Sequence, residues 1–352
     1  MHPPAPQRGR GTTVNPHNRF APTRVIASDE PDWQDEPPSR ATEVRLETAK
    51  TILTRNQSPD LPFDRTLNPY RGCEHGCIYC FARPTHAYWD LSPGLDFETR
   101  LIAKHNAASV LREQLSKPSY QCAPVNLGAN TDPYQPIERE HRLTRQLLEV
   151  LLDFRHPVTV VTKGSLILRD LDVLRELARQ NLVRVHISLT TLDDELKRTL
   201  EPRAASAAAR LRVIRALREQ QVPVGVLCAP MIPMVNDCEL EQLLQAAKEA
   251  GADCANYILL RLPREVAPLF EQWLRDHLPQ RAEHVLSLMR QSRGGELYDS
   301  RFGNRMRGQG AFAELLAQRF AVAMRKLGLA RHPTTPLDSS RFCRPGGQLA
   351  LL

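Results

Sequence analysis

The sequence predicts an α/β protein in which parallel strands are joined by helices. Short apolar runs rich in β-branched residues alternate with longer stretches that carry apolar residues at helical spacing. Such an alternation favours parallel strands with right-handed crossovers. The chain has 352 residues, of which 41% are hydrophobic and 25% charged, values typical of a globular protein. This length suits one barrel-like domain with extensions or two ordinary domains.

Residues 1–45 are rich in proline and have little apolar periodicity, so we expect a disordered N-terminal arm. Its arginines could contact a nucleic acid or an acidic partner, and an unstructured tail is the alternative. These arginines are Arg8, Arg10, Arg19 and Arg24. A short helix is expected over residues 43–53. We expect residues 46–262 to form the main domain and residues 263–352 a helical C-terminal extension.

The most specific motif is NPYRGCEHGCIYCFARP, which we call the cluster loop (residues 68–84). Cys73, Cys77 and Cys80 follow the spacing C-x-x-x-C-x-x-C. Each residue spans at most about 3.6 Å, so the three thiols must converge on one small group. An ordinary four-cysteine cluster or zinc site needs another nearby ligand, and no cysteine follows at the usual spacing. The loop therefore predicts an iron–sulfur site.

Other features of the loop bear on this prediction. Gly72 and Gly76 each precede a cysteine, and glycine readily adopts the positive φ values that let a backbone curl around a cluster. A zinc knuckle completed by His75 or His86 is one alternative. A plain electron-transfer cluster is another, although it would normally have four cysteines.

This cysteine spacing, with Tyr79 just before the last cysteine, resembles the cluster loop of radical S-adenosylmethionine (SAM) enzymes. The resemblance implies a 4Fe-4S cluster that is held by three cysteines and binds SAM at its fourth iron. It also implies reductive cleavage of SAM to a 5′-deoxyadenosyl radical, which abstracts hydrogen from a substrate. A reductant such as flavodoxin or ferredoxin would be the electron-donating partner.

The expected elements resemble the partial (β/α)6 barrel of the same family. A strand just before the cluster loop and five later ones give about six βα units, too few for a closed eight-stranded barrel. The later strands are expected at residues 125–127, 158–162, 183–189, 224–229 and 254–260. Helices are expected at residues 97–115, 142–154, 171–179, 204–219 and 239–250, and in the extension at 266–276, 281–290 and 312–327.

Ligands of parallel α/β folds lie at the carboxyl ends of the strands, so polar residues there are site candidates. Asn130, Thr131 and Asp132 follow the second strand, and the resemblance implies that they contact the SAM amino group. An Asx turn before Pro133 is the alternative for Asp132.

The next strand ends bring three more candidates. Lys163 ends the third strand, where its ammonium could pair with the SAM carboxylate. Ser188 ends the fourth strand, and its contact with SAM is implied by a resemblance to spore photoproduct lyase and its relatives. Arg203 could bind the ribose or carboxylate bidentately, and a salt bridge with Glu201 is its alternative.

One departure from the lyase pattern concerns the hydrogen donor. The lyase has a cysteine where this chain has Asn130, and an amide cannot return a hydrogen atom as a thiol can. Dimer repair by the same route is therefore not expected. The substrate class stays open, and modification of RNA, DNA or another biomolecule is compatible with the sequence.

Charge makes nucleic acid a candidate partner. The net charge of +7 favours phosphate-bearing ligands, and an ordinary solvated surface is the alternative. The segment at 290–307 combines arginines with aromatic residues, a combination that suits phosphate and stacked bases, and we expect it to close the open side of the barrel. A flexible basic loop is its alternative. Its members are Arg290, Arg293, Arg301, Arg305, Arg307, Tyr298 and Phe302.

The sequence also bears on location and on other classes of function. It has no run of about 18 apolar residues and no signal-peptide core, so we expect a cytoplasmic protein without a membrane span. The alternative to an enzyme is a non-catalytic iron–sulfur protein that transfers electrons or binds nucleic acid.

Overall fold

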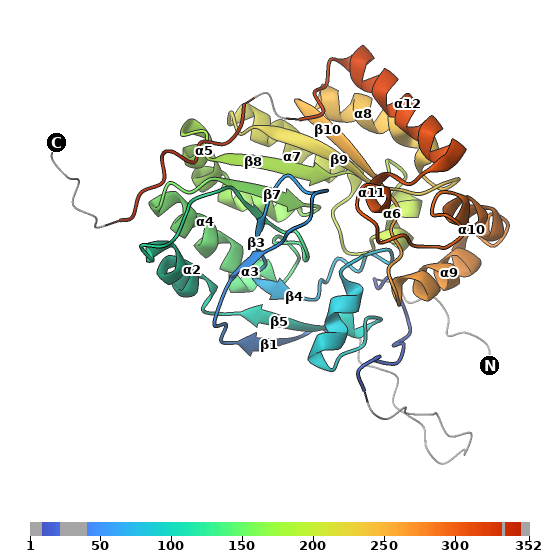
Figure 1. Ribbon diagram of the computed structural model, residues 1–352, viewed down its shortest axis with the longest axis horizontal. Helices are drawn as coiled ribbons and strands as arrows, with labels where there is room; N and C mark the ends of the chain where they lie inside the picture. Colours follow the sequence, from blue (N-terminus) through green and yellow to red (C-terminus); the bar gives the residue numbers. More distant parts are fainter. Residues whose placement is uncertain (1–8, 22–40, 333–334, 346–352) are drawn as a thin grey trace.

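A computed structural model describes residues 9–21, 41–332 and 335–345 and shows a partial barrel (Figure 1). Its seven-stranded sheet has the order β10-β9-β8-β7-β6-β3-β2. Neighbouring strands are parallel except β2 and β3, which are antiparallel. The strands are β2 (Leu53–Arg55), β3 (Arg65–Leu67), β6 (Val125–Leu127), β7 (Val158–Thr162), β8 (Val183–Ser188), β9 (Val224–Met231) and β10 (Cys254–Leu259). The six parallel strands confirm the predicted (β/α)6 architecture, and β10 and β2 are its open edges.

Helices cover the outer face of this sheet (Figure 1). The strands bury alternate valine and leucine side chains against them, and each fully buried side chain of this size contributes about 1.5–3 kcal/mol. The covering helices are α2 (Ala107–Ser116), α4 (Leu143–Asp153), α5 (Leu171–Arg179), α7 (Ala207–Glu219) and α8 (Leu240–Glu249). Shorter helices in the connections are η1 (Arg83–Trp89), α1 (Asp96–Thr99), α3 (Glu138–His141), η2 (Ser165–Asp170), α6 (Asp194–Leu200) and η3 (Asp237–Glu239).

A second, three-stranded sheet corrects two predictions. It has the order β1-β5-β4, with β1 (Glu43–Glu47), β5 (Arg100–Lys104) and β4 (Tyr70–Arg71). The helix predicted over 43–53 is wrong, because this stretch contains β1. The helix predicted over 97–115 is wrong for its first half, which is divided between α1 and β5. Leu101, Ile102 and Ala103 are all buried, and pairing with β1 and β4 outweighs the local helical pattern.

The C-terminal part is helical, as predicted. It contains α9 (Val266–His277), α10 (Ala282–Gln291), α11 (Asn304–Arg307) and α12 (Gly310–Leu327). The long helix α12 returns to the barrel and packs on α8 and β10, where the rings of Phe320 and Tyr257 lie 4.8 Å apart. In the described part of the chain, no helix combines the length and apolar character needed to cross a membrane.

Residues 9–21 lie against the barrel, although the composition predicted disorder there. Arg10 donates from Nη1 to the carbonyl of Glu98 at 2.8 Å, and the backbone N–H of Gly11 donates to the carboxylate of Glu98 at 2.9 Å. Arg19 pairs with Glu265 at 2.7 Å. The arginines predicted at positions 8 and 24 lie outside the described residues. The described part of the arm therefore forms a strap across the cluster loop.

Candidate functional site

The cluster loop runs from β4 into η1 and carries the three predicted ligands. Cys73 and Cys77 are buried, and Cys80 is partly buried. Gly72 and Gly76 have φ values of +73° and +67°, which confirms the conformation expected of them. A Cβ on Gly72 would approach a backbone carbonyl to 2.8 Å. Only glycine fits at this position.

A buried ion pair fixes the path of this loop. Arg83, at the start of η1, pairs with Glu98 at 2.5 Å, and both side chains are fully buried. The same guanidinium donates to the carbonyl oxygens of Cys77 at 3.0 Å and Gly94 at 2.9 Å. The Glu98 carboxylate also accepts from the N-terminal strap. The side chain of Arg83 therefore contacts the cluster loop at Cys77 and the neighbouring segment at Gly94 and Glu98.

The chemistry of the three thiols fits an iron–sulfur cluster. Burial raises the pKa of each thiol, that of Cys77 to about 12. Nearby positive charge acts in the opposite direction, because Lys163 lowers the pKa of Cys77 and of Cys80. A bound metal would supply the further positive charge that favours the thiolate form of these buried thiols. The site is thus built to be completed by a cationic group.

The arrangement fits a cluster better than a zinc knuckle. Within the described ranges, no three histidine, cysteine, aspartate or glutamate side chains gather closely enough to hold one metal ion. A zinc ion needs its ligands around a single centre. The thiolates of a four-iron cluster bind different irons and therefore stand further apart.

A polar network lies next to the loop, at the carboxyl ends of β7 and β8. Glu201 is fully buried and accepts from the hydroxyls of Tyr79 and of Thr190, the latter at 2.7 Å, and from the guanidinium of Arg210. Burial opposes its charge, but Arg210 and Lys163 lower the pKa of Glu201 to about 2. The carboxylate is therefore ionised and holds Tyr79 in place.

Lys163 and Ser188, the candidates that follow β7 and end β8, are in contact with each other. Lys163 Nζ donates to Ser188 Oγ at 2.9 Å and lies 3.9 Å from the carboxylate of Glu201. Ser188 Oγ in turn donates to the carbonyl of Ala229 on β9 at 3.1 Å. The ammonium is thereby held beside the cluster loop, 5.9 Å from the ring centre of Tyr79.

The loop after β6 contains the predicted residues Asn130, Thr131 and Asp132, which we call the β6 triad. Asp132 accepts from Thr162 Oγ1 at 2.6 Å and from the backbone N–H groups of Lys163 at 2.7 Å and Tyr134 at 2.9 Å. Burial alone would raise the pKa of Asp132, but His75, 3.3 Å away, and these donors lower it to about 2. The contact with Tyr134 is the Asx turn considered as the alternative.

The other two residues of the triad, Asn130 and Thr131, differ in what their side chains contact. Thr131 is buried and donates from its hydroxyl to the carbonyl of Tyr70 at 3.0 Å. Asn130 is partly exposed, and its backbone N–H donates to Asn68 at 2.9 Å. Its side-chain amide makes no hydrogen bond with any residue that the structure describes. Of the triad, Asn130 therefore has the side chain most available to a ligand.

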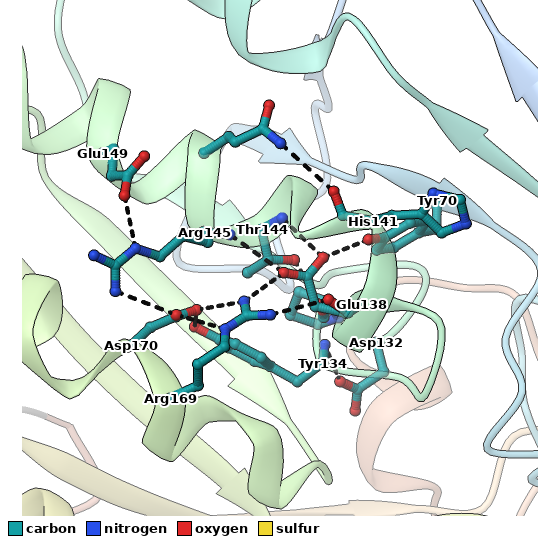
Figure 2. A network of polar contacts seen from close by, with 12 residues as sticks. Tyr70, Asp132, Tyr134, Glu138, His141, Thr144, Arg145, Glu149, Arg169 and Asp170 are labelled. Carbon is teal, nitrogen blue, oxygen red and sulfur yellow. Dashed lines mark hydrogen bonds and ion pairs between the residues drawn. The ribbon is translucent and has the colours of Figure 1, made fainter.

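A buried ionic network supports this loop from behind (Figure 2). Arg169 lies between two fully buried carboxylates and donates to Glu138 at 2.6 Å and to Asp170 at 2.8 Å. Tyr134 donates from its hydroxyl to Asp170 at 3.1 Å, and Tyr70 donates to Glu138. The network connects η2, α3 and β4, and so fixes the loop that carries the triad.

Arg203 lies near the cluster loop but has a different partner from the one considered. It pairs with Glu74, which directly follows Cys73, at 3.0 Å, and its backbone N–H donates to the carbonyl of His75. Glu201 pairs with Arg210 instead. Arg203 is 37% exposed, so its guanidinium can also reach a ligand.

The arginine-rich segment is largely engaged by protein groups. Arg293 is buried and donates to the carbonyls of Leu259 and Leu260, while Arg301 pairs with Asp299 at 2.8 Å. The members of the segment therefore differ in exposure: Arg293 is buried, whereas Arg301 and Phe302 remain exposed.

Several site residues were missed in the sequence. Their roles depend on partners far away in the chain, and no local spacing indicates them. The missed residues are Glu74, Arg83, Glu98, Glu138 and Arg210.

Comparison with known proteins identifies the family. Residues 67–247 match the Radical SAM superfamily. The chain is 38% identical over 272 residues to "Uncharacterized protein Rv2578c" of Mycobacterium tuberculosis, covering 77% of this chain and 76% of that protein. It is 25% identical over 173 residues to "Uncharacterized protein MJ0683" of Methanocaldococcus jannaschii, covering 49% of this chain and 62% of that one. This chain belongs to the radical SAM superfamily, whose members use a 4Fe-4S cluster and SAM.

Solved structures agree on the fold. A mutant of spore photoproduct lyase superposes with a TM-score of 0.60 at 15% identity, covering 83% of this chain and 82% of that one. The lyase complexed with dinucleoside spore photoproduct gives a TM-score of 0.58 at 14% identity, covering 81% and 79%. The likeness confirms the predicted resemblance of the barrel to this branch.

Proposed function

We propose that this radical SAM enzyme cleaves SAM reductively and abstracts a hydrogen atom from a substrate through the 5′-deoxyadenosyl radical. The observation that carries the proposal is the cluster loop itself. Three cysteines on a loop pinned by Arg83 lie at the carboxyl ends of parallel strands, beside an ionised polar network. When bound, the reduced cluster supplies the electron for SAM cleavage.

The chain's own residues bind and orient SAM in this proposal. Lys163, held by Ser188, pairs with the SAM carboxylate, because an ammonium next to a carboxylate forms a strong charge-assisted hydrogen bond. Asn130 offers its amide oxygen to the SAM amino group, while Thr131 and Asp132 hold the loop that carries it.

Arg203, next to the cluster loop, and Tyr79, within it, complete the SAM site. Arg203 is exposed enough to bind the ribose or the carboxylate while it stays near Glu74. Tyr79 keeps the Glu201 network against the loop. Because Glu201 is already bound by protein donors, it orients its neighbours and leaves Lys163 for SAM.

The electron donor and the substrate belong to the proposal as well. Enzymes of this family need an electron donor, and we propose a flavodoxin or ferredoxin for that role. The substrate we propose is a nucleic acid, which the net charge of +7 and the fold of spore photoproduct lyase both support. Asn130 in place of a thiol makes the return of a hydrogen atom from that position chemically unavailable, so a modification fits better than dimer repair.

A SAM cleavage assay tests the proposal. The protein is reconstituted with iron and sulfide without oxygen, reduced with dithionite and given SAM, and methionine and 5′-deoxyadenosine are measured by mass spectrometry. Cleavage is expected in the wild type and should be abolished in Cys77→Ala. Cys228→Ala, which removes a buried thiol of β9, is the matched control and should retain cleavage. A cluster that assembles without cleaving SAM would favour the non-catalytic electron-transfer or nucleic-acid-binding alternative.

A further inference from the structure

Three arginines lie along β10 and just past its carboxyl end, and they donate hydrogen bonds only to neutral groups: Arg307 lies beside the middle of the strand, and Arg261 and Arg293 lie beyond its end. Arg261 donates to the hydroxyl of Tyr298 at 3.4 Å, and Arg307 donates to the amide oxygen of Asn256 at 2.6 Å. Arg293 donates to backbone carbonyls, that of Leu260 at 2.7 Å. None of the three forms an ion pair with a residue in the described part of the chain.

Each of these guanidinium groups also has a buried nitrogen without a hydrogen-bond partner among the described residues. These atoms are Nε of Arg261, Nε of Arg293 and Nη1 of Arg307. Burial and the neighbouring charge of Arg261 lower the pKa of Arg293 to about 10. Desolvated cations that lack both a counter-charge and full hydrogen bonding are unfavourable unless an anion joins them.

Two carboxylates interact electrostatically with these arginines, Asp60 with Arg261 and Asp299 with Arg293, and other groups hydrogen-bond to both of them. The charge of Asp299 raises the pKa of Arg293, whereas burial and Arg261 lower it. The oxygens of Asp299, however, accept from Arg301 at 2.8 Å and from Asn304 at 3.4 Å. Arg301 lies in the same segment and is 67% exposed. The carboxylate of Asp299 is therefore bound on the solvent side, and the arginine trio (Arg261, Arg293 and Arg307) keeps its excess positive charge.

The trio lies between the open edge of the sheet and the SAM site. Asn256 is in register with Leu227, and Leu227 is in register with Ser188, so Arg307 reaches the sheet at the level of Ser188. The guanidinium of Arg261 lies 5.1 Å from the ring centre of Phe81, which directly follows Cys80. An anion held here would thus lie between the β10 edge and the cluster loop.

The segment that carries two of these arginines bridges the open side of the barrel. Its helix α11 lies beside the end of β10 (Figure 1). On the other side, Arg305 and the backbone N–H of Gly303 donate to Asp60, in the connection between β2 and β3, at 2.5 and 2.8 Å. These contacts support the expectation that the segment closes the gap between β10 and β2, with the trio on the β10 side.

We propose that Arg261, Arg293 and Arg307 bind the phosphodiester backbone of a nucleic-acid strand and so present one nucleotide to the SAM site. Guanidinium groups match phosphate oxygens in charge and in planar hydrogen-bonding geometry. Exposed aromatic rings for base stacking lie next to arginines here, Phe81 at 43% and Phe302 at 59% exposure. This inference rests on the proposed function for the reaction that would follow binding.

Binding of labelled single-stranded DNA and RNA to the cluster-loaded full chain tests the inference. Fluorescence anisotropy over a range of salt concentrations compares the wild type with Arg261→Gln and Arg307→Gln. We expect each substitution to weaken binding about tenfold and to reduce the salt slope by about 0.7, because one phosphate charge is no longer neutralised by the protein. The control is Arg275→Gln, which removes the same charge from a 56% exposed position on α9 and should bind as the wild type does.

The possible outcomes separate this inference from the proposed function. A wild type that binds neither strand, or trio variants that bind as well as the control, overturns the phosphodiester site. A preference for DNA or RNA identifies the strand. If Arg307→Gln unfolds below the assay temperature, the test rests on the binding affinity of Arg261→Gln alone. SAM cleavage is measured separately on the wild type, so a protein that binds the strand without cleaving SAM overturns only the proposed function.

Discussion

Removing the Arg83 charge should damage the cluster loop more than any surface substitution does. In Arg83→Gln, the carboxylate of Glu98 stays buried without its 2.5 Å partner, and the carbonyls of Cys77 and Gly94 lose their donor. Breaking a buried ion pair by removing one partner costs about 3–5 kcal/mol. We therefore expect the free energy of unfolding to fall by about 3–5 kcal/mol.

The chain offers a matched control at the surface. Arg112 and Asp153 also form a 2.5 Å ion pair, but their side chains are 47% and 49% exposed. An exposed pair contributes about 0–1 kcal/mol, so Arg112→Gln should change stability by that amount at most. The same distance in two environments isolates the effect of burial. Restoring neutrality with the double substitution Arg83→Gln and Glu98→Gln should recover part of the stability, because no unpaired charge remains.

Urea unfolding of the four proteins, followed by circular dichroism, measures these differences. Iron content after anaerobic reconstitution gives a second, functional reading of the same loop. If Arg83→Gln were no less stable than Arg112→Gln and bound a full complement of iron, the assignment of Arg83 as the residue that fixes the loop would be wrong. A double variant less stable than Arg83→Gln alone would show that the missing hydrogen bonds, and not the unpaired charge, dominate.

Three further results are expected. Gly76→Ala should bind little iron on reconstitution, because φ is +67° and the new Cβ would lie 2.8 Å from Glu98. Lys163→Met should weaken SAM binding by about 1.5–3 kcal/mol in isothermal titration, as expected when a hydrogen bond to a charged group is removed, and unchanged affinity would remove Lys163 from the SAM site. Burial lowers the pKa of His156 and of His186 from 6.5 to about 4, so the unfolded chain binds more protons than the folded chain between these values. The free energy of unfolding should therefore be greatest above pH 6.5 and decrease as the pH falls toward 4, by about 2 kcal/mol for each histidine near pH 5. Urea unfolding at several pH values should show a smaller decrease in His156→Gln than in the wild type.

The sequence predicted most of the parallel sheet because its strands are buried apolar runs. Residues 158–162 are all β-branched and form β7 without a shift. The predictions failed where apolar residues fitted both periods. Residues 100–104 lie between two helical turns, and only pairing with β1 on one side and β4 on the other makes them a strand. That information is tertiary, and a local pattern does not contain it.

The candidate site shows the same division. The cysteine spacing and the strand-end residues Lys163 and Ser188 are local features, and the structure brings the last two within 2.9 Å of each other. The partners of the charged residues are not local features. Arg203 was considered with Glu201, two positions earlier, but binds Glu74 across the loop. A charged side chain can pair with a residue close in sequence or with one that the fold brings near, and the local sequence does not show which partner it has.

The distribution of buried charge indicates where a ligand is still required. Four fully buried carboxylates in the described part of the barrel have arginine partners: Glu98 has Arg83, Glu138 and Asp170 share Arg169, and Glu201 has Arg210. Such pairing makes the interior nearly neutral, as the cost of desolvating a charge demands. The arginines along β10 and beyond its end differ from these pairs, because Arg261, Arg293 and Arg307 donate only to neutral groups. In the nucleic-acid site that we propose, a phosphate supplied from outside would restore the balance, and Arg261 beside Phe81 would connect substrate binding with the chemistry at the cluster.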